Sequence, residues 1–246
     1  TLLKGRTLIV LAILLVFFSF ATPNFLSTNT MLLLAKHVAL YGILAIGMTY
    51  VIITGGIDLS VGAVVGLAGM VAGGMIQKGI TLTMMGVTLY FDVPLVVLFT
   101  LIMGAVVGLV NGIIITKFGV APFIATLGTM YIARGFSMLH SQGATYSDIV
   151  GKEALGNVGI TFFGSRVLGI PVGAVILIII AIVAGILLKK TTFGWHIFAI
   201  GGNEKAAKLS GIKVDKVKIL VYIFSAVCAA IIGIITAAQL EASHPA

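Results

Sequence analysis

Long apolar stretches alternate with short polar ones along almost the whole of this 246-residue chain. A helix needs about 20 predominantly apolar residues to cross a bilayer, and most of the stretches reach that length. The pattern therefore predicts an all-α, polytopic integral membrane helix bundle with about seven spans. The predicted spans are residues 7–22, 31–53, 59–76, 94–116, 121–140, 169–188 and 217–240.

The third span follows a break in a much longer apolar run. Gly55 and Gly56 interrupt this run in the segment GGIDLSVG, and Asp58 is placed to cap a helix that restarts at Leu59. Two interpretations of Asp58 stay open. It is either a structural N-cap or, with the neighbouring Ser60, a polar group that lines the route of a polar solute.

Two more polar residues lie inside predicted spans. Asn111 shares the fourth span with Gly104, Gly108 and Gly112, whose spacing of four residues places them on one helix face. Arg134 lies within the fifth span, where it either reaches the lipid headgroups or shapes an outer vestibule. The candidates for lining the translocation path or for breaking a helix are therefore Gly55, Gly56, Asp58, Ser60, Asn111 and Arg134.

The longest charged segment, residues 189–218, holds seven lysines and only two acids. Basic residues gather in cytoplasmic loops, so the segment and the N-terminus are predicted to be cytoplasmic. Ten of the fifteen basic residues then fall on that side. The net charge of +8 therefore reflects topology and predicts no binding to nucleic acid. Residues 141–169 form a mixed polar connection on the other side.

A short helix is predicted inside the charged segment. Gly201-Gly202 breaks the chain, Asn203 can cap, and residues 204–210 give two helical turns that Gly211 closes. Such a helix at the membrane's inner face offers a contact surface to another protein. The alternative is a solvated basic loop whose lysines only fix the topology.

Composition excludes several classes of function. Hydrophobic residues make up 60% of the chain, charged residues only 9%, and the mean hydropathy is +1.23, whereas soluble domains carry roughly 25% charged residues. The single cysteine, Cys228, lies in an apolar run, and the four histidines are scattered. We therefore predict that the chain is not an enzyme and that it has no catalytic residues, metal site or bound cofactor.

Uphill transport by this chain would need an outside source of energy. The sequence has no G-x-x-x-x-G-K-[ST] pattern for nucleotide phosphates. Asp58 is the only acid inside the long interrupted apolar run, and the first six spans hold too few acids for an obvious proton relay. Energy is therefore expected to enter from a partner, and residues 189–218 are the only sizeable cytoplasmic surface that could receive it.

Three segments, GGIDLSVG, FIATLGTMYIARG and AIGGNEKAAKLSGI, resemble the ribose-type sugar permeases in order and spacing. These are the membrane subunits of bacterial ABC importers for monosaccharides, and the resemblance covers essentially the whole chain. It implies a dimer of permeases in the lipid of the cytoplasmic membrane. It also implies an extracytoplasmic sugar-binding protein and a cytoplasmic ATPase subunit, which would use the ATP.

Permeases of such importers carry a cytoplasmic EAA-x3-G loop that contacts the ATPase. The matching positions here are Lys205, Ala206 and Ala207, followed by Gly211, and the acidic residue is displaced by one position to Glu204. The resemblance therefore implies that residues 189–218 are a coupling loop. Its implied ATPase-coupling residues are Asn203, Glu204, Ala206, Ala207 and Gly211.

The family is expected to have about ten spans in its full-length members. Residues 1–246 are accordingly expected to form a single transmembrane permease domain that is truncated at both ends. Several functions stay open beside a monosaccharide importer: an autoinducer-2 importer permease of the same family, an ion-coupled secondary sugar transporter that uses Asp58, and a passive channel. The sequence does not identify the sugar.

Overall fold

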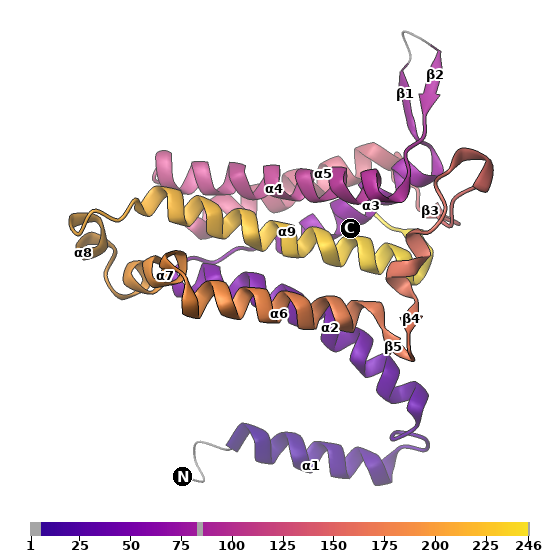
Figure 1. Cartoon of the computed structure of the whole chain (residues 1–246), viewed down its shortest axis with the longest axis horizontal. Helices are drawn as coiled ribbons and strands as arrows, with labels where there is room; N and C mark the ends of the chain where they lie inside the picture. Colours follow the sequence, from indigo (N-terminus) through magenta and orange to yellow (C-terminus); the bar gives the residue numbers. More distant parts are fainter. Residues whose placement is uncertain (1–5, 83–85, 246) are drawn as a thin grey trace.

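The computed structural model describes residues 6–82 and 86–245, and a helix occupies each predicted span (Figure 1). Helices α2, α4, α6 and α9 are long and apolar enough to cross a membrane, and α1 and α3 are shorter apolar helices. Helix α5 is the least apolar of the seven. The protein is therefore an all-α polytopic membrane protein. The helices are α1 (Arg6–Ala21), α2 (Thr28–Ile53), α3 (Val61–Gln77), α4 (Val93–Lys117), α5 (Pro122–Ser141), α6 (Val172–Lys190) and α9 (Val214–Leu240).

Helix α9 lies at the centre and packs against α2, α3 and α4. Of its most apolar stretch 61% is buried, compared with 17%, 22% and 17% for α2, α4 and α6. Small residues occupy many of its buried positions and let neighbouring backbones approach closely. They are Ser225, Ala226, Cys228, Ala229, Ala230, Gly233, Ala237 and Ala238.

The glycine stripe of α4 faces α9, as its spacing of four residues allows. A Cβ atom added at Gly104 would lie 2.7 Å from the Cβ of Ala230, and one at Gly108 would meet the backbone carbonyl of Tyr222. A Cβ at Gly112 would be equally close to the α9 backbone. The two helices therefore touch along a surface that only glycine permits on the α4 side.

Helix α1 lies apart from this bundle and reaches α2 through a turn (Figure 1). From Leu8 to Ala21 every residue is exposed except Ser19, which is half-buried. The exposed surface is almost wholly apolar, which suits contact with lipid chains.

The connections gather at two ends of the bundle (Figure 1). We call one the α7/α8 end, because it carries α7 (Thr192–Gly202) and α8 (Glu204–Leu209). We call the other the hairpin end, after the antiparallel pair β1–β2 that projects from it. Strand β3 pairs antiparallel with β6 there, and β4 with β5. The hairpin end holds β1 (Ile80–Leu82), β2 (Val87–Leu89), β3 (Tyr146–Ser147), β4 (Arg166–Val167), β5 (Ile170–Pro171), β6 (Ala242–Ser243) and the 3₁₀ turns η2 (Glu153–Leu155) and η3 (Ile160–Gly164).

Helix α7 corrects the expectation that residues 189–218 are a loop with one short helix. The Thr191 hydroxyl accepts a hydrogen bond from the Gly194 N–H at 3.3 Å and caps the helix. Ile197 and Ile200 are buried against the bundle. Most of the charged segment is therefore helical, and α7 packs on the bundle through a few buried residues while most of the segment stays exposed.

The connection between α5 and α6 is also more ordered than a polar loop. Asn157 is fully buried: its side-chain oxygen accepts from the Lys152 N–H at 2.7 Å, and its amide donates to the Ile76 carbonyl at 2.8 Å. Ile149 and Ile160 are fully buried as well. This connection packs over the hairpin end of α3 and α9.

Candidate functional site

The break between α2 and α3 depends on its two glycines. Gly55 has a φ of +78°, a left-handed conformation that glycine adopts without a steric penalty. A Cβ atom at Gly56 would meet the hydroxyl of Tyr222 on α9. Glycine therefore allows this turn without backbone strain at position 55, and a side chain at position 56 would have to displace the Tyr222 hydroxyl.

Asp58 follows the two glycines in this turn, and it is only 1% exposed. Its Oδ1 accepts from the Ser60 N–H at 3.0 Å and from the Ser60 hydroxyl at 2.6 Å, and its Oδ2 accepts from the Ser225 hydroxyl of α9 at 3.3 Å. The predicted cap on a helix restarting at Leu59 is wrong. Helix α3 begins at Val61 and has no side-chain cap, because the carboxylate binds groups in the turn before the helix and on α9.

The same network reaches α4 and α5. Asn111 donates through Nδ2 to the Ser60 hydroxyl at 3.0 Å and accepts through Oδ1 from the Thr129 hydroxyl at 2.6 Å. Thr126, one turn earlier on α5, accepts from the Leu59 N–H at 3.1 Å. Hydrogen bonds thus connect the break to α4, α5 and α9, and such a buried network favours one arrangement of the helices. The buried Tyr222 hydroxyl beside it has no hydrogen-bond partner among the described residues.

The structure brings together all the predicted residues of the break except one. Arg134 lies exposed on α5, and no hydrogen bond or ion pair links it to the described part of the network. Four further residues of this cluster were not predicted from the sequence: Thr126, Thr129, Tyr222 and Ser225. The spacing of Thr126 and Thr129 on one face of α5 was a detectable signal. The residues that the structure does bring together are Gly55, Gly56, Asp58, Ser60 and Asn111.

One face of α9 connects the break with α8. Lys218, Tyr222 and Ser225 are spaced at i, i+4 and i+7, so they share that face. Lys218 forms an ion pair with Glu204 of α8 at 2.6 Å, and the other two residues contact the break. Lys218 and Tyr222 also line a cavity of about 20 Å³ beside Gly55 and Gly56.

Helix α8 begins as predicted. The Asn203 side chain accepts from the Ala206 N–H at 3.0 Å, which confirms the cap, and Gly211 follows the helix with a φ of +85°. The ion pair with Lys218 gives the displaced Glu204 a structural partner.

The exposed face of α8 differs from the expected one. Ala207 is 4% exposed and packs with Val214 and Val217, so its small side chain serves a contact within the chain. Ala206 is exposed, and Leu209, which the sequence analysis did not single out, is 90% exposed. Leu209 therefore lies outside the bundle, at the last residue of α8.

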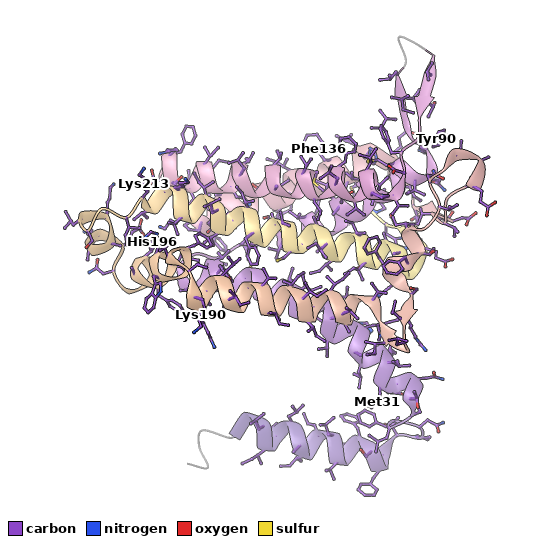
Figure 2. The ribbon with its side chains drawn as sticks, viewed as in Figure 1. Met31, Tyr90, Phe136, Lys190, His196 and Lys213 are labelled. Carbon is purple, nitrogen blue, oxygen red and sulfur yellow. The ribbon has the colours of Figure 1, made fainter. Side chains whose placement is uncertain are left out.

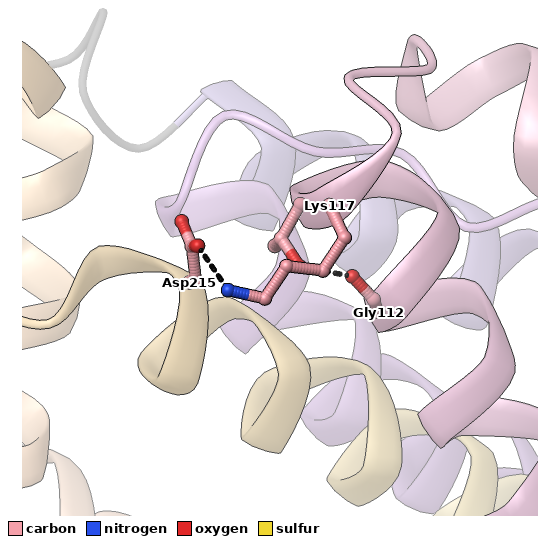
Figure 3. A network of polar contacts seen from close by, with 4 residues as sticks. Gly112, Lys117 and Asp215 are labelled. Atoms are coloured by element: carbon pink, nitrogen blue, oxygen red, sulfur yellow. Dashed lines mark hydrogen bonds and ion pairs between the residues drawn. The ribbon is translucent and has the colours of Figure 1, made fainter.

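A second ion pair fixes this end of the bundle. Lys117, at the end of α4, binds Asp215 in the first turn of α9 at 2.8 Å (Figure 3). The Thr116 hydroxyl donates to the Gly112 carbonyl at 2.7 Å in the same turn of α4. In residues 6–82 and 86–245 no three His, Cys, Asp or Glu side chains are grouped so that they could hold a metal ion.

The fold and the break define a class: a polytopic membrane protein whose central helices meet at a buried polar cluster. Residues 30–246 match the family described as "Branched-chain amino acid transport system / permease component", and the chain belongs to this family. It is therefore a permease component of a transport system.

The chain is similar to several curated relatives. It is 42% identical to the ribose import permease protein of Bacillus subtilis (strain 168), over 96% of this chain and 68% of the relative. It is 36% identical to the ribose import permease protein of Haemophilus influenzae (99% and 72%) and 32% identical to the D-allose transport system permease protein of Escherichia coli K12 (98% and 70%). No solved structure matches the chain.

Proposed function

We propose that this chain is the membrane-spanning permease subunit of an ABC importer that moves a monosaccharide across the bacterial cytoplasmic membrane. Its family is a transport permease, and its relatives are named as permeases for ribose, D-allose and fructose. An ion-coupled transporter is less well supported, because both oxygens of Asp58 already accept hydrogen bonds from serines. ATP would be used by a partner subunit.

The α7/α8 end is proposed to face the cytoplasm. It carries eight lysines and two acids, and such an excess of basic residues favours the cytoplasmic side. Helix α1 begins at the same end, so the N-terminus is cytoplasmic too (Figure 1). The hairpin end then faces the extracytoplasmic sugar-binding protein, and a second permease copy completes the transporter. The eight lysines are Lys117, Lys189, Lys190, Lys205, Lys208, Lys213, Lys216 and Lys218.

The observation that carries the proposal is the way α8 is held. Asn203 caps it, Ala207 packs it onto the bundle, and the Glu204–Lys218 ion pair binds it to α9. Leu209 is left outside. We infer that α8 docks on the ATPase through the Leu209 side and transmits movement to the bundle through Lys218.

The route of transmission is one face of α9. Tyr222 and Ser225, which contact the break, follow Lys218 at one-turn spacing. A displacement of α8 therefore acts on a helix that contacts both the coupling surface and the break between α2 and α3. We infer that α9 has two positions, which both the ATPase and the break between α2 and α3 favour differently.

The test is Leu209→Asp, with Leu168→Asp as its control. Both leucines are almost fully exposed, at 90% and 98%, but Leu168 lies at the hairpin end between β4 and β5. Burying a leucine stabilises a contact by about 1.5–3 kcal/mol, so Leu209→Asp should weaken ATPase binding about tenfold or more. Complexes of the full-length permease would be reconstituted, and ATPase affinity, sugar-stimulated ATP hydrolysis and uptake would be measured.

Leu168→Asp should leave ATPase affinity unchanged. Wild-type affinity and hydrolysis in Leu209→Asp would contradict the docking assignment. Sugar uptake by the permease alone, driven by a proton or sodium gradient, would instead support the ion-coupled alternative.

A further inference from the structure

A groove of about 680 Å³ opens between α4 and α9 at the α7/α8 end. Its lining has two parts, a basic rim and an apolar wall. The rim consists of Lys117, Lys208, Lys213 and Lys216, with the single acid Asp215. The wall includes Leu109, Ile219, Leu220 and Ile223.

The rim concentrates positive charge from three elements. Lys117 ends α4, Lys208 belongs to α8, and Lys213 and Lys216 lie at the start of α9. Four lysines and one acid leave a net charge of +3. Within the described residues only Lys117 of these four forms an ion pair, with Asp215. The rim is therefore suited to bind an anion.

The wall restricts which anion fits. It extends along α9 from Lys216 to Ile223, seven residues or about 10 Å of helix, into a membrane-spanning segment. Leu109 and Leu220 are 38% and 41% exposed along it. A ligand that fills the groove must carry an anionic group at one end and a hydrocarbon chain at the other.

We propose that this groove binds an anionic phospholipid, with its phosphate at the lysine rim and an acyl chain along the wall. Basic pockets between helices at the membrane surface favour anionic headgroups. A soluble partner would not reach the wall inside the span. A second copy would bring the same lysines to the rim, and the acids at this end, Glu204 and Asp215, already have partners.

The test compares two double variants that remove the same charge. Lys213→Gln/Lys216→Gln lies in the rim, and Lys189→Gln/Lys190→Gln lies at the same end but outside the groove. Figure 2 shows Lys213 at the start of α9 and Lys190 at the end of α6. Binding of phosphatidylglycerol and phosphatidylcholine to the purified, complete transporter would be measured by native mass spectrometry, with the thermal midpoint recorded for each protein.

The rim variant should bind phosphatidylglycerol about 10- to 30-fold more weakly, and the control should stay within about twofold of wild type. Inorganic phosphate should not compete, since it lacks the chain that the wall requires. Equal losses in both double variants, or equal binding of phosphatidylcholine, would overturn the proposal. If the rim variant has a lowered thermal midpoint, phosphatidylglycerol binding is measured instead for Lys208→Gln. This variant removes one rim charge from the exposed face of α8.

The variant Leu220→Cys, in the Cys228→Ala background, gives an independent measurement by cysteine cross-linking. Cross-linking of this cysteine to a second permease copy or to the ATPase would assign the groove to a protein partner and overturn the lipid site. These experiments measure lipid binding and cross-linking, and none of them measures sugar transport. The proposal of a lipid site can therefore be contradicted while the proposed transport function stands.

Discussion

Helices α1 and α9 are both strongly apolar, yet one lies alone and the other at the centre of the bundle (Figure 1). Helix α1 has no glycine and presents large side chains on all sides, whereas α9 buries a row of Ala, Gly, Ser and Cys residues. Apolar character places a helix in the membrane. Small residues, and polar groups with partners, decide which helices then pack together.

The largest effect is expected where α4 touches α9. Gly108→Leu would force a side chain into the α9 backbone at the Tyr222 carbonyl, so α4 and α9 could not pack together, and the loss should be well above the ~1–3 kcal/mol typical of an overpacked side chain. Gly185→Leu on α6 is the matched control, since a Cβ at Gly185 meets nothing within 4 Å. Yield of monodisperse protein and thermal midpoint in detergent would fall for Gly108→Leu alone. A normal midpoint for Gly108→Leu would show that the α4–α9 contact is not tight.

The polar contact of α9 with the break is expected to come next. Asp58→Leu leaves the Ser60 N–H, the Ser60 hydroxyl and the Ser225 hydroxyl without their acceptor, at about 1–3 kcal/mol for each buried group. Asp58→Asn keeps one acceptor oxygen and should lose only about 1 kcal/mol. Thermal unfolding and sugar uptake would be measured for both variants. A stably folded Asp58→Asn protein without transport would show that Asp58 meets the solute directly.

The smallest effect is expected in α1. Leu11 is 52% exposed, so Leu11→Ala should change stability by less than about 0.5 kcal/mol. The corresponding change at a fully buried position of α9, Ile235→Ala, should cost about 2–5 kcal/mol. Similar thermal midpoints for the two variants would contradict the conclusion that α9 contributes to the packed bundle and α1 does not.

The positions of the spans could be predicted because each is a long apolar run with a polar boundary. The glycine stripe of α4 and the cap at Asn203 could also be predicted, because spacing and capping act locally. The partners of Asp58 could not: Ser225 lies 167 residues away, and only the tertiary packing brings it close. Helix α7 was not predicted, because lysines precede and follow it and its apolar residues were therefore assigned to a cytoplasmic loop. The burial of Ala207 likewise depends on how α8 docks.

The central position of α9 has a consequence for synthesis. Helices α2, α3 and α4 all leave the ribosome earlier than α9, and they must wait in the bilayer without the helix against which each of them packs most. At translation rates of about 5–20 residues per second, the 167 residues between Asp58 and Ser225 take roughly 10–30 s to make. During that interval the Asp58 carboxylate lacks one of its hydrogen-bond donors, and the α4 glycines face no neighbour. A nascent chain at this stage is a substrate for membrane chaperones and proteases, and the arrival of α9 ends that exposure.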